Sequence, residues 1–200
     1  MRKTRILAPL ALAAAAALAA GVATLLKKPA AEAAEAAAPQ QAPSGIKNLR
    51  SGSYSFISGF QDAVTVELGM DYDGEKYGFA VIEDEFPSYS GDSHVAVVWG
   101  EDFNMQLEYA SYYSGEDFAA HCRGVAERYQ GFRPLRFGSL EGVSFIDGDN
   151  ICIHLPIPGD AHSYLLVTLM KSPDNDEDFT ALPEHPDVQA MLGSLRFQII

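Results

Sequence analysis

The sequence predicts a single acidic α+β domain, built from an antiparallel β-sheet covered by an amphipathic helix and a short C-terminal helix. Short runs of β-branched and aromatic residues, separated by turn residues, fill most of the chain after residue 44. One segment among them changes to helical periodicity, and another follows a proline near the C-terminus. Because the strands group around helices and do not alternate with them, a doubly wound parallel sheet is not expected.

The first half of the domain contains the runs that predict hairpins. A turn is expected at residues 71–74 (DYDG), and another at 100–102 (GED). We expect five strands here, at residues 53–57, 63–68, 77–82, 94–99 and 104–110.

A helix is expected next, with Ser114 as its cap, acidic residues in its first turn and Gly131 at its end. Arg123 and Glu127 fall on its polar side, so the helix is expected to cover a sheet. Its apolar face consists of residues at helical spacing: Phe118, Cys122, Val125 and Tyr129.

The second half of the domain returns to strands. Residues 163–170 (SYLLVTLM) are the most continuously apolar run, which predicts a central strand. An acidic loop is expected at 173–184, and Pro186 opens a helix at 187–195. The other expected strands lie at residues 133–137, 142–146 and 150–157.

The head of the chain reads as an export segment. Residues 6–26 carry no charge and follow a basic start; a helix of this length spans roughly 31 Å, the thickness of a bilayer core. Residues 1–28 are therefore expected to be an N-terminal membrane anchor or a cleaved signal peptide, and 29–44 a flexible Ala/Pro-rich linker. The domain at 45–200 would lie outside the cytoplasm, anchored to the membrane or secreted.

The charge of the domain bounds its partners. From residue 45 onward there are nine Lys/Arg and 25 Asp/Glu, a net charge of −16. Such a field repels phosphate backbones and anionic lipid headgroups. We therefore expect no nucleic-acid binding, and contact with the membrane only through the N-terminal segment.

No residue pattern predicts a catalytic, cofactor or metal site. The five histidines form no HExxH motif, and there is no G-x-S-x-G elbow, P-loop or Rossmann fingerprint. His121 and Cys122 point about 100° apart on a helix, so they cannot act as a base and nucleophile pair. Cys122 and Cys152 could form one disulfide, and the alternative is that both are buried, reduced thiols. His154 shares a strand face with Cys152.

Two other features leave alternatives open. The acidic runs 71–75 and 174–178 are read as solvated turns, with weak Ca²⁺ binding as the alternative. Five aromatic residues are read as core and sheet-face packing, with a sugar-stacking surface as the alternative; two of them, Tyr112 and Tyr113, are expected to be exposed. The five are Trp99, Phe103, Tyr109, Tyr112 and Tyr113.

The C-terminal segment 186–197 (PDVQAMLGSLRF), together with the helix at 114–129 and the hairpin around Gly148, resembles the Mog1/PsbP-like domains of bacterial exported proteins. The similarity of pattern covers residues 53–197. It implies a non-enzymatic binding or assembly role by analogy. The expected function is a membrane-tethered or secreted accessory module that contacts another envelope protein, and the alternative is a cell-surface domain that binds a small ligand, carbohydrate or Ca²⁺.

Overall fold

The computed structural model describes residues 46–58, 64–83, 94–112, 116–172 and 178–200. The predicted anchor or signal segment and the linker lie outside these residues, as do Ser114 and Tyr113. No helix in the described part of the chain is long and apolar enough to cross a bilayer. The described residues form mostly antiparallel β-sheet with a few short helices, which confirms the α+β class.

The larger sheet has seven strands in the spatial order β3-β4-β5-β9-β8-β7-β6, and all neighbours are antiparallel. β9 lies in the middle, as its continuous apolar run predicts. The strands are β3 (Tyr77–Glu83), β4 (His94–Gly100), β5 (Phe103–Ser111), β6 (Gln130–Phe137), β7 (Leu140–Asp147), β8 (Asn150–Pro156) and β9 (Ser163–Lys171).

A second, three-stranded sheet has the order β1-β2-β10, with β1 at Leu49–Ser58, β2 at Val64–Asp73 and β10 at Arg196–Ile199. The sequence indicated one sheet and a turn at residues 71–74. Both expectations were wrong, because β2 continues to Asp73 and the last residues of the chain return to pair with it. The turn falls at residues 74–76 instead.

The main core lies between one face of the larger sheet and the inner face of the smaller sheet. Aromatic rings join the two sheets: Phe56 stacks on Tyr109 with ring centroids 4.7 Å apart, and Tyr72 stacks on Phe79 at 5.8 Å. Fully buried aliphatic residues from both sheets fill the space between them, among them Leu68, Met70, Met105, Leu107, Leu165 and Leu169.

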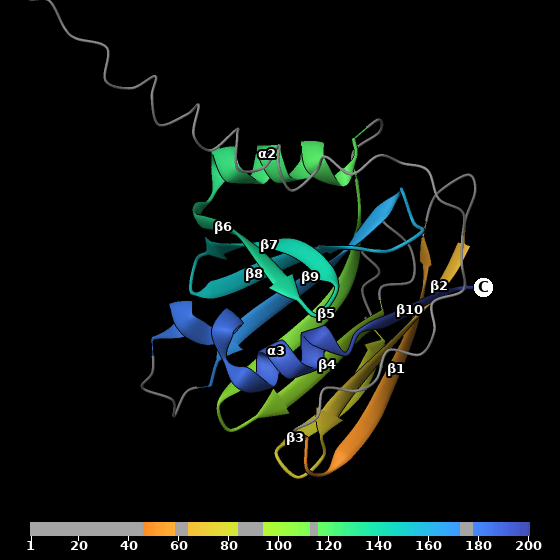
Figure 1. Cartoon of the computed structure of the whole chain (residues 1–200), viewed down its shortest axis with the longest axis vertical. Coiled ribbons are helices and arrows are strands. Elements are labelled where there is room, and N and C mark those ends of the chain that lie inside the picture. The colour runs from red at the N-terminus through yellow and green to blue at the C-terminus, as the bar shows by residue number, and fades with distance from the viewer. Residues whose placement is uncertain (1–45, 59–63, 84–93, 113–115, 173–177) are drawn as a thin grey trace, which may run out of the picture. The chain divides into compact units, whose positions relative to one another are not determined.

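Helix α2 (Phe118–Arg128) covers the opposite face of the larger sheet. Its cap is Asp117, whose carboxylate accepts a hydrogen bond of 2.7 Å from the backbone N–H of Ala120. Val125 packs with Phe145 and Cys152 in a small cluster separate from the main core. The predicted covering helix is confirmed, and it lies apart from the C-terminal helix α3 (Figure 1). Two details were wrong: the helix begins at Phe118, so its first turn carries no acidic residue, and it ends at Arg128, before Gly131, because β6 begins at Gln130.

The expected acidic loop contains a 3₁₀ helix, η1 (Phe179–Glu184), in its described part. It leads into α3 (Pro186–Gly193), which begins at Pro186 as predicted. Val188, Met191 and Leu192 are buried on α3 and belong to the main core, so this helix closes the core beside the smaller sheet.

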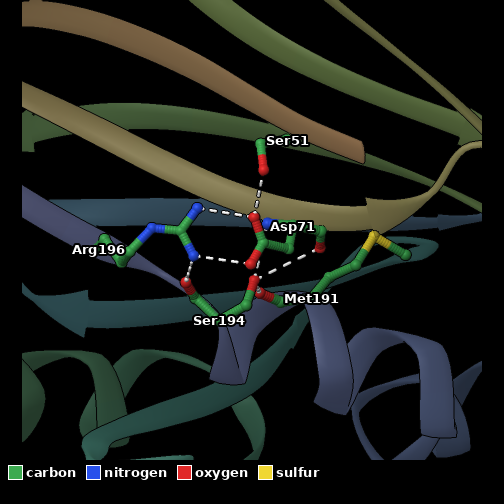
Figure 2. A network of polar contacts seen from close by, with 5 residues as sticks. All are labelled: Ser51, Asp71, Met191, Ser194 and Arg196. Carbon is green, nitrogen blue, oxygen red and sulfur yellow. Dashed lines mark hydrogen bonds and ion pairs between the residues drawn. The ribbon is translucent and has the colours of Figure 1, made fainter. Parts of the chain in front are cut away.

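A buried polar network ties the C-terminus to β2 (Figure 2). The Asp71 carboxylate accepts two hydrogen bonds of 2.7 Å from the Arg196 guanidinium and one of 2.6 Å from the Ser51 hydroxyl. The Asp71 backbone N–H donates to the Ser194 hydroxyl at 2.8 Å, and that hydroxyl donates to the Met191 carbonyl. The hydrogen bonds from Arg196 are the main reason that the pKa of Asp71 is lowered. The network joins β1, β2, β10 and the end of α3.

Candidate binding surface

One part of the larger sheet presents apolar side chains away from the main core. On β3, β4 and β5 alternate residues point to opposite faces, and one set includes the fully buried residues Ala96, Val98 and Met105. We call the other set the open face. It consists of Gly78, Ala80 and Ile82 on β3, Val95, Val97 and Trp99 on β4, and Asn104, Gln106 and Glu108 on β5.

Trp99 is the most prominent residue of the open face. It stands directly opposite Gly78 in the β3–β4 pair, and a Cβ at position 78 would collide with the indole ring. The ring therefore lies across the glycine backbone, an approach that a residue with a side chain would block. In this position 48% of Trp99 is exposed to solvent. The structure thus holds a large aromatic side chain against the sheet with much of it in water.

Aliphatic residues continue the surface along the same two strands. Ile82 is 52% exposed at the far end of β3, and Val95 and Val97 on β4 are half-buried. The neighbouring strand β5 adds polar groups: Asn104 lies opposite Trp99, and Gln106 donates a hydrogen bond to Glu108. The open face therefore combines an apolar strip with a polar margin.

The open face and the surface under α2 belong to one side of the sheet. The pairing register runs from Val97 through Gln106 and Thr168 to Cys152, so these four residues form one cross-strand row. Cys152 is buried in the α2 cluster, whereas Val97 is only half-buried. Among the described elements, α2 thus covers one half of this side and leaves the β3–β4 half exposed.

Acidic residues surround the Trp99 end of the open face. The turns next to it carry Asp73, Glu75, Glu101 and Asp102. Two cations lie at these turns: Lys76, which already donates a 2.9 Å hydrogen bond to Asp187 at the start of α3, and Arg50 on β1, whose side chain packs against Gly74. This end of the surface therefore favours positively charged groups.

Three residues near that end, Asp102, His185 and Asp187, lie close enough together to hold a metal ion. Their groups already have partners within the protein. Asp187 accepts hydrogen bonds from Lys76 and from the Tyr77 hydroxyl, each 2.9 Å long, and His185 Nδ1 accepts from the Asp187 backbone N–H at 3.2 Å. These contacts fit a stabilising ion pair at the start of α3 better than a cation site.

The structure separates the five aromatic residues considered for a sugar-stacking surface. Trp99 is exposed, but Phe103 is fully buried. Tyr109 is partly buried against the core, and Tyr113 lies outside the described residues. Tyr112, expected to be exposed, is only partly so, because it stacks on Tyr164 at 5.3 Å and packs against His121.

The two cysteines are free and buried, Cys122 on α2 and Cys152 on β8 below it. Burial raises the pKa of the Cys122 thiol to about 12 and raises that of Cys152 as well, so both are protonated near neutral pH. Beside them lies an arrangement that the sequence did not indicate, a contact of 2.8 Å between the rings of His121 and His154.

Within the residues that the structure describes, two carboxylates of the acidic runs considered for Ca²⁺ make contacts with other parts of the protein. Asp71 is buried and bound to Arg196, so it does not offer its carboxylate to solvent. Asp178 accepts a hydrogen bond of 3.0 Å from the Thr180 backbone N–H as the cap of η1, and residues 173–177 lie outside the described residues.

Comparisons with protein-family models, curated proteins and solved structures gave no match to this chain. The resemblance to Mog1/PsbP-like domains therefore stays a prediction.

Proposed function

We propose that residues 45–200 form an extracytoplasmic binding module that contacts another envelope protein through the open face. The observation that carries this proposal is the exposed Trp99 held over Gly78, with Ile82 exposed on the same face. Contiguous exposed apolar side chains mark interaction sites more often than single ones do, and tryptophan is enriched among the residues that dominate binding energy.

The charges at the surface define the complementary partner. The apolar strip around Trp99 and Ile82 requires an apolar contact, and the acidic turns at the Trp99 end favour Lys or Arg on the partner. The net charge of −16 beyond residue 44 acts in the same direction over longer distances, because it attracts cationic surfaces and repels anionic ones.

The predicted anchor and linker fit this role. A flexible linker of the length of residues 29–44 has an end-to-end distance of roughly 20 Å. It would hold the domain close to the membrane while leaving it free to turn its open face toward a neighbouring protein. Tethering of this kind raises the effective concentration of the module near other envelope proteins.

The test is crosslinking of the full-length chain in its own cells, followed by purification in mild detergent and quantitative mass spectrometry. Trp99→Ala is compared with wild type, and Ile57→Ala serves as the matched control, because Ile57 is 53% exposed on β1 in the other sheet. We expect one partner at near-equal stoichiometry, reduced at least tenfold by Trp99→Ala and unchanged by Ile57→Ala. Recovery of no partner, or of one indifferent to Trp99, would contradict the proposal.

Carbohydrate binding is the second candidate, and the pairing of Trp99 with Asn104 favours it. An exposed indole beside a side-chain amide offers a stacking surface and hydrogen bonds to a sugar ring. Because Trp99 is the only tryptophan in the chain, its fluorescence reports on the open face alone. A saturable change in emission on titration with cell-wall glycans would favour this candidate, and no change at millimolar concentration would remove it.

A further inference from the structure

A pair of buried histidines connects α2 to the larger sheet. His121 on α2 and His154 on β8 place Nε2 and Nδ1 2.8 Å apart, and both residues are less than a tenth exposed. A hydrogen bond between two imidazoles needs one nitrogen without a proton as its acceptor. The contact is therefore lost when both rings are protonated, and two positive charges then face each other inside the protein.

The surroundings of the pair are mostly aromatic. The ring of Tyr164 on β9 packs on both imidazoles, with ring centroids 4.2 Å apart for His121 and 4.6 Å apart for His154. Phe145 on β7 contacts His154 edge-on, with ring centroids 4.8 Å apart. Tyr112, which follows β5, packs on His121 at 5.7 Å. These rings offer no carboxylate to balance a positive charge.

The titratable groups nearby do not change this balance. Cys122 on α2 and Cys152 on β8 are protonated thiols, and Glu116 before α2 opposes the effect of Arg128 on His121. Burial is the largest influence on both histidines: it lowers the pKa of His121 and lowers that of His154 to about 3. Burial therefore favours the neutral form of both imidazoles while α2 is in place.

The attachment of α2 is also structurally separate from the rest of the domain. Its apolar contacts belong to the small cluster of Val125, Phe145 and Cys152, with Tyr129, Phe132 and Leu166 at the margin. The main core lies on the other side of the sheet and includes no residue of α2. Detachment of α2 would expose this cluster and leave the two-sheet core closed.

We propose that the His121–His154 pair is an acid-sensitive latch, in which protonation of both imidazoles breaks their hydrogen bond and releases α2 from the sheet. Release uncovers Phe145, Cys152 and Leu166, which lie on the same side of the sheet as the open face. The latch itself does not depend on the proposed function. The consequence that acid enlarges a partner-binding surface does rest on it.

The expected pH range follows from the ordinary pKa of histidine. In the released state each imidazole meets water and titrates near 6.5. At pH 5 such a ring is protonated about thirty times more often than not, whereas in the docked state burial favours the neutral form of both rings. The released fraction therefore rises by up to about thirtyfold per histidine between pH 7.5 and 5.

The experiment uses the two buried thiols as reporters in the full-length chain, held in mild detergent. The reagent is 4,4′-dithiodipyridine, which reacts with thiols in mildly acidic solution, and labelled cysteines are identified by mass spectrometry. Rates at pH 7.5, 6 and 5 are divided by those of the urea-unfolded chain at the same pH. We expect the normalised rate for Cys152 to rise at least tenfold toward pH 5, with Trp99 emission unchanged because β3 and β4, which hold the Trp99 ring, stay folded.

Three variants decide whether the two histidines cause the rise in the Cys152 rate toward pH 5. His154→Phe and His121→Gln each remove one of the two titrating rings, so each is expected to make the rise in the Cys152 rate toward pH 5 less steep than in the wild type. The two variants are made independently so that one misfolded variant does not end the test. His162→Gln removes an exposed histidine outside the pair and is expected to leave the profile unchanged. A flat wild-type profile, an unchanged rise in both pair variants, or a rise that coincides with a change in Trp99 emission would overturn the proposal.

Discussion

Replacement of Arg196 by Met tests the buried network around Asp71. The change removes both guanidinium hydrogen bonds and leaves Asp71, whose side chain is 5% exposed, with the Ser51 hydroxyl as its remaining side-chain donor. Loss of one partner of a buried ion pair costs about 3–5 kcal/mol, because the other charge stays buried. Arg196 is itself 39% exposed, so we expect a loss at the lower end, about 3 kcal/mol.

The assay is urea unfolding at pH 7, followed by Trp99 fluorescence. Lys76→Met is the matched control, because the Lys76–Asp187 pair has a similar distance but Lys76 is 56% exposed; we expect it to cost less than about 1 kcal/mol. A loss below 1 kcal/mol for Arg196→Met, equal to that of the control, would refute the argument.

The pH dependence gives a second check on the same variant. In the wild type the pKa of Asp71 lies below 3.8, so its contribution to stability is present above that pH and is lost as the pH falls through the lowered value. Without Arg196, burial raises the pKa of Asp71, and the folded state then favours the protonated carboxyl. We therefore expect the stability difference between wild type and variant to shrink between pH 7 and pH 3. A stability difference that stays constant between pH 7 and pH 3 would mean that Asp71 does not cause the loss of stability in Arg196→Met.

Three other predictions concern the side of the larger sheet that carries the open face and α2. Gly78→Val forces the indole of Trp99 off β3, so we expect a shift of its emission to longer wavelength and a loss of about 1–3 kcal/mol in urea unfolding. Trp99→Ala is expected to cost about 1 kcal/mol or less in the same assay, because much of the ring is already in water. Iodoacetamide at pH 8 is expected to leave Cys122 unmodified in the folded protein and to alkylate it in urea, because burial raises its thiol pKa to about 12; mass spectrometry measures the difference.

The strands and the helices could be predicted where local pattern decides the structure. The alternation and turn residues of β7 and β8, the apolar run of β9 and the helical spacing of α2 all carry their own signal. The end of β2 carries no such local signal. Its DYDG run is typical of a turn, but Asp71 is held in the strand by Arg196, a partner 125 residues away, and no local pattern records that pairing.

The candidate surface was harder to find for a related reason. The sequence of β4 is apolar on both faces, so alternation alone does not tell which face meets the core. The assignment depends on where β1 and β2 pack, and that arrangement places Val98 inside and Trp99 outside. The same holds for His121 and His154, whose contact arises only when α2 docks on β8.

The position of β10 also determines when folding can be completed. β2 is made early in synthesis, yet one of its two neighbours is the last strand of the chain, and the guanidinium that neutralises Asp71 arrives with it. A nascent chain therefore lacks both until β10 has been made, 125 residues after Asp71, and contacts so distant in sequence form slowly.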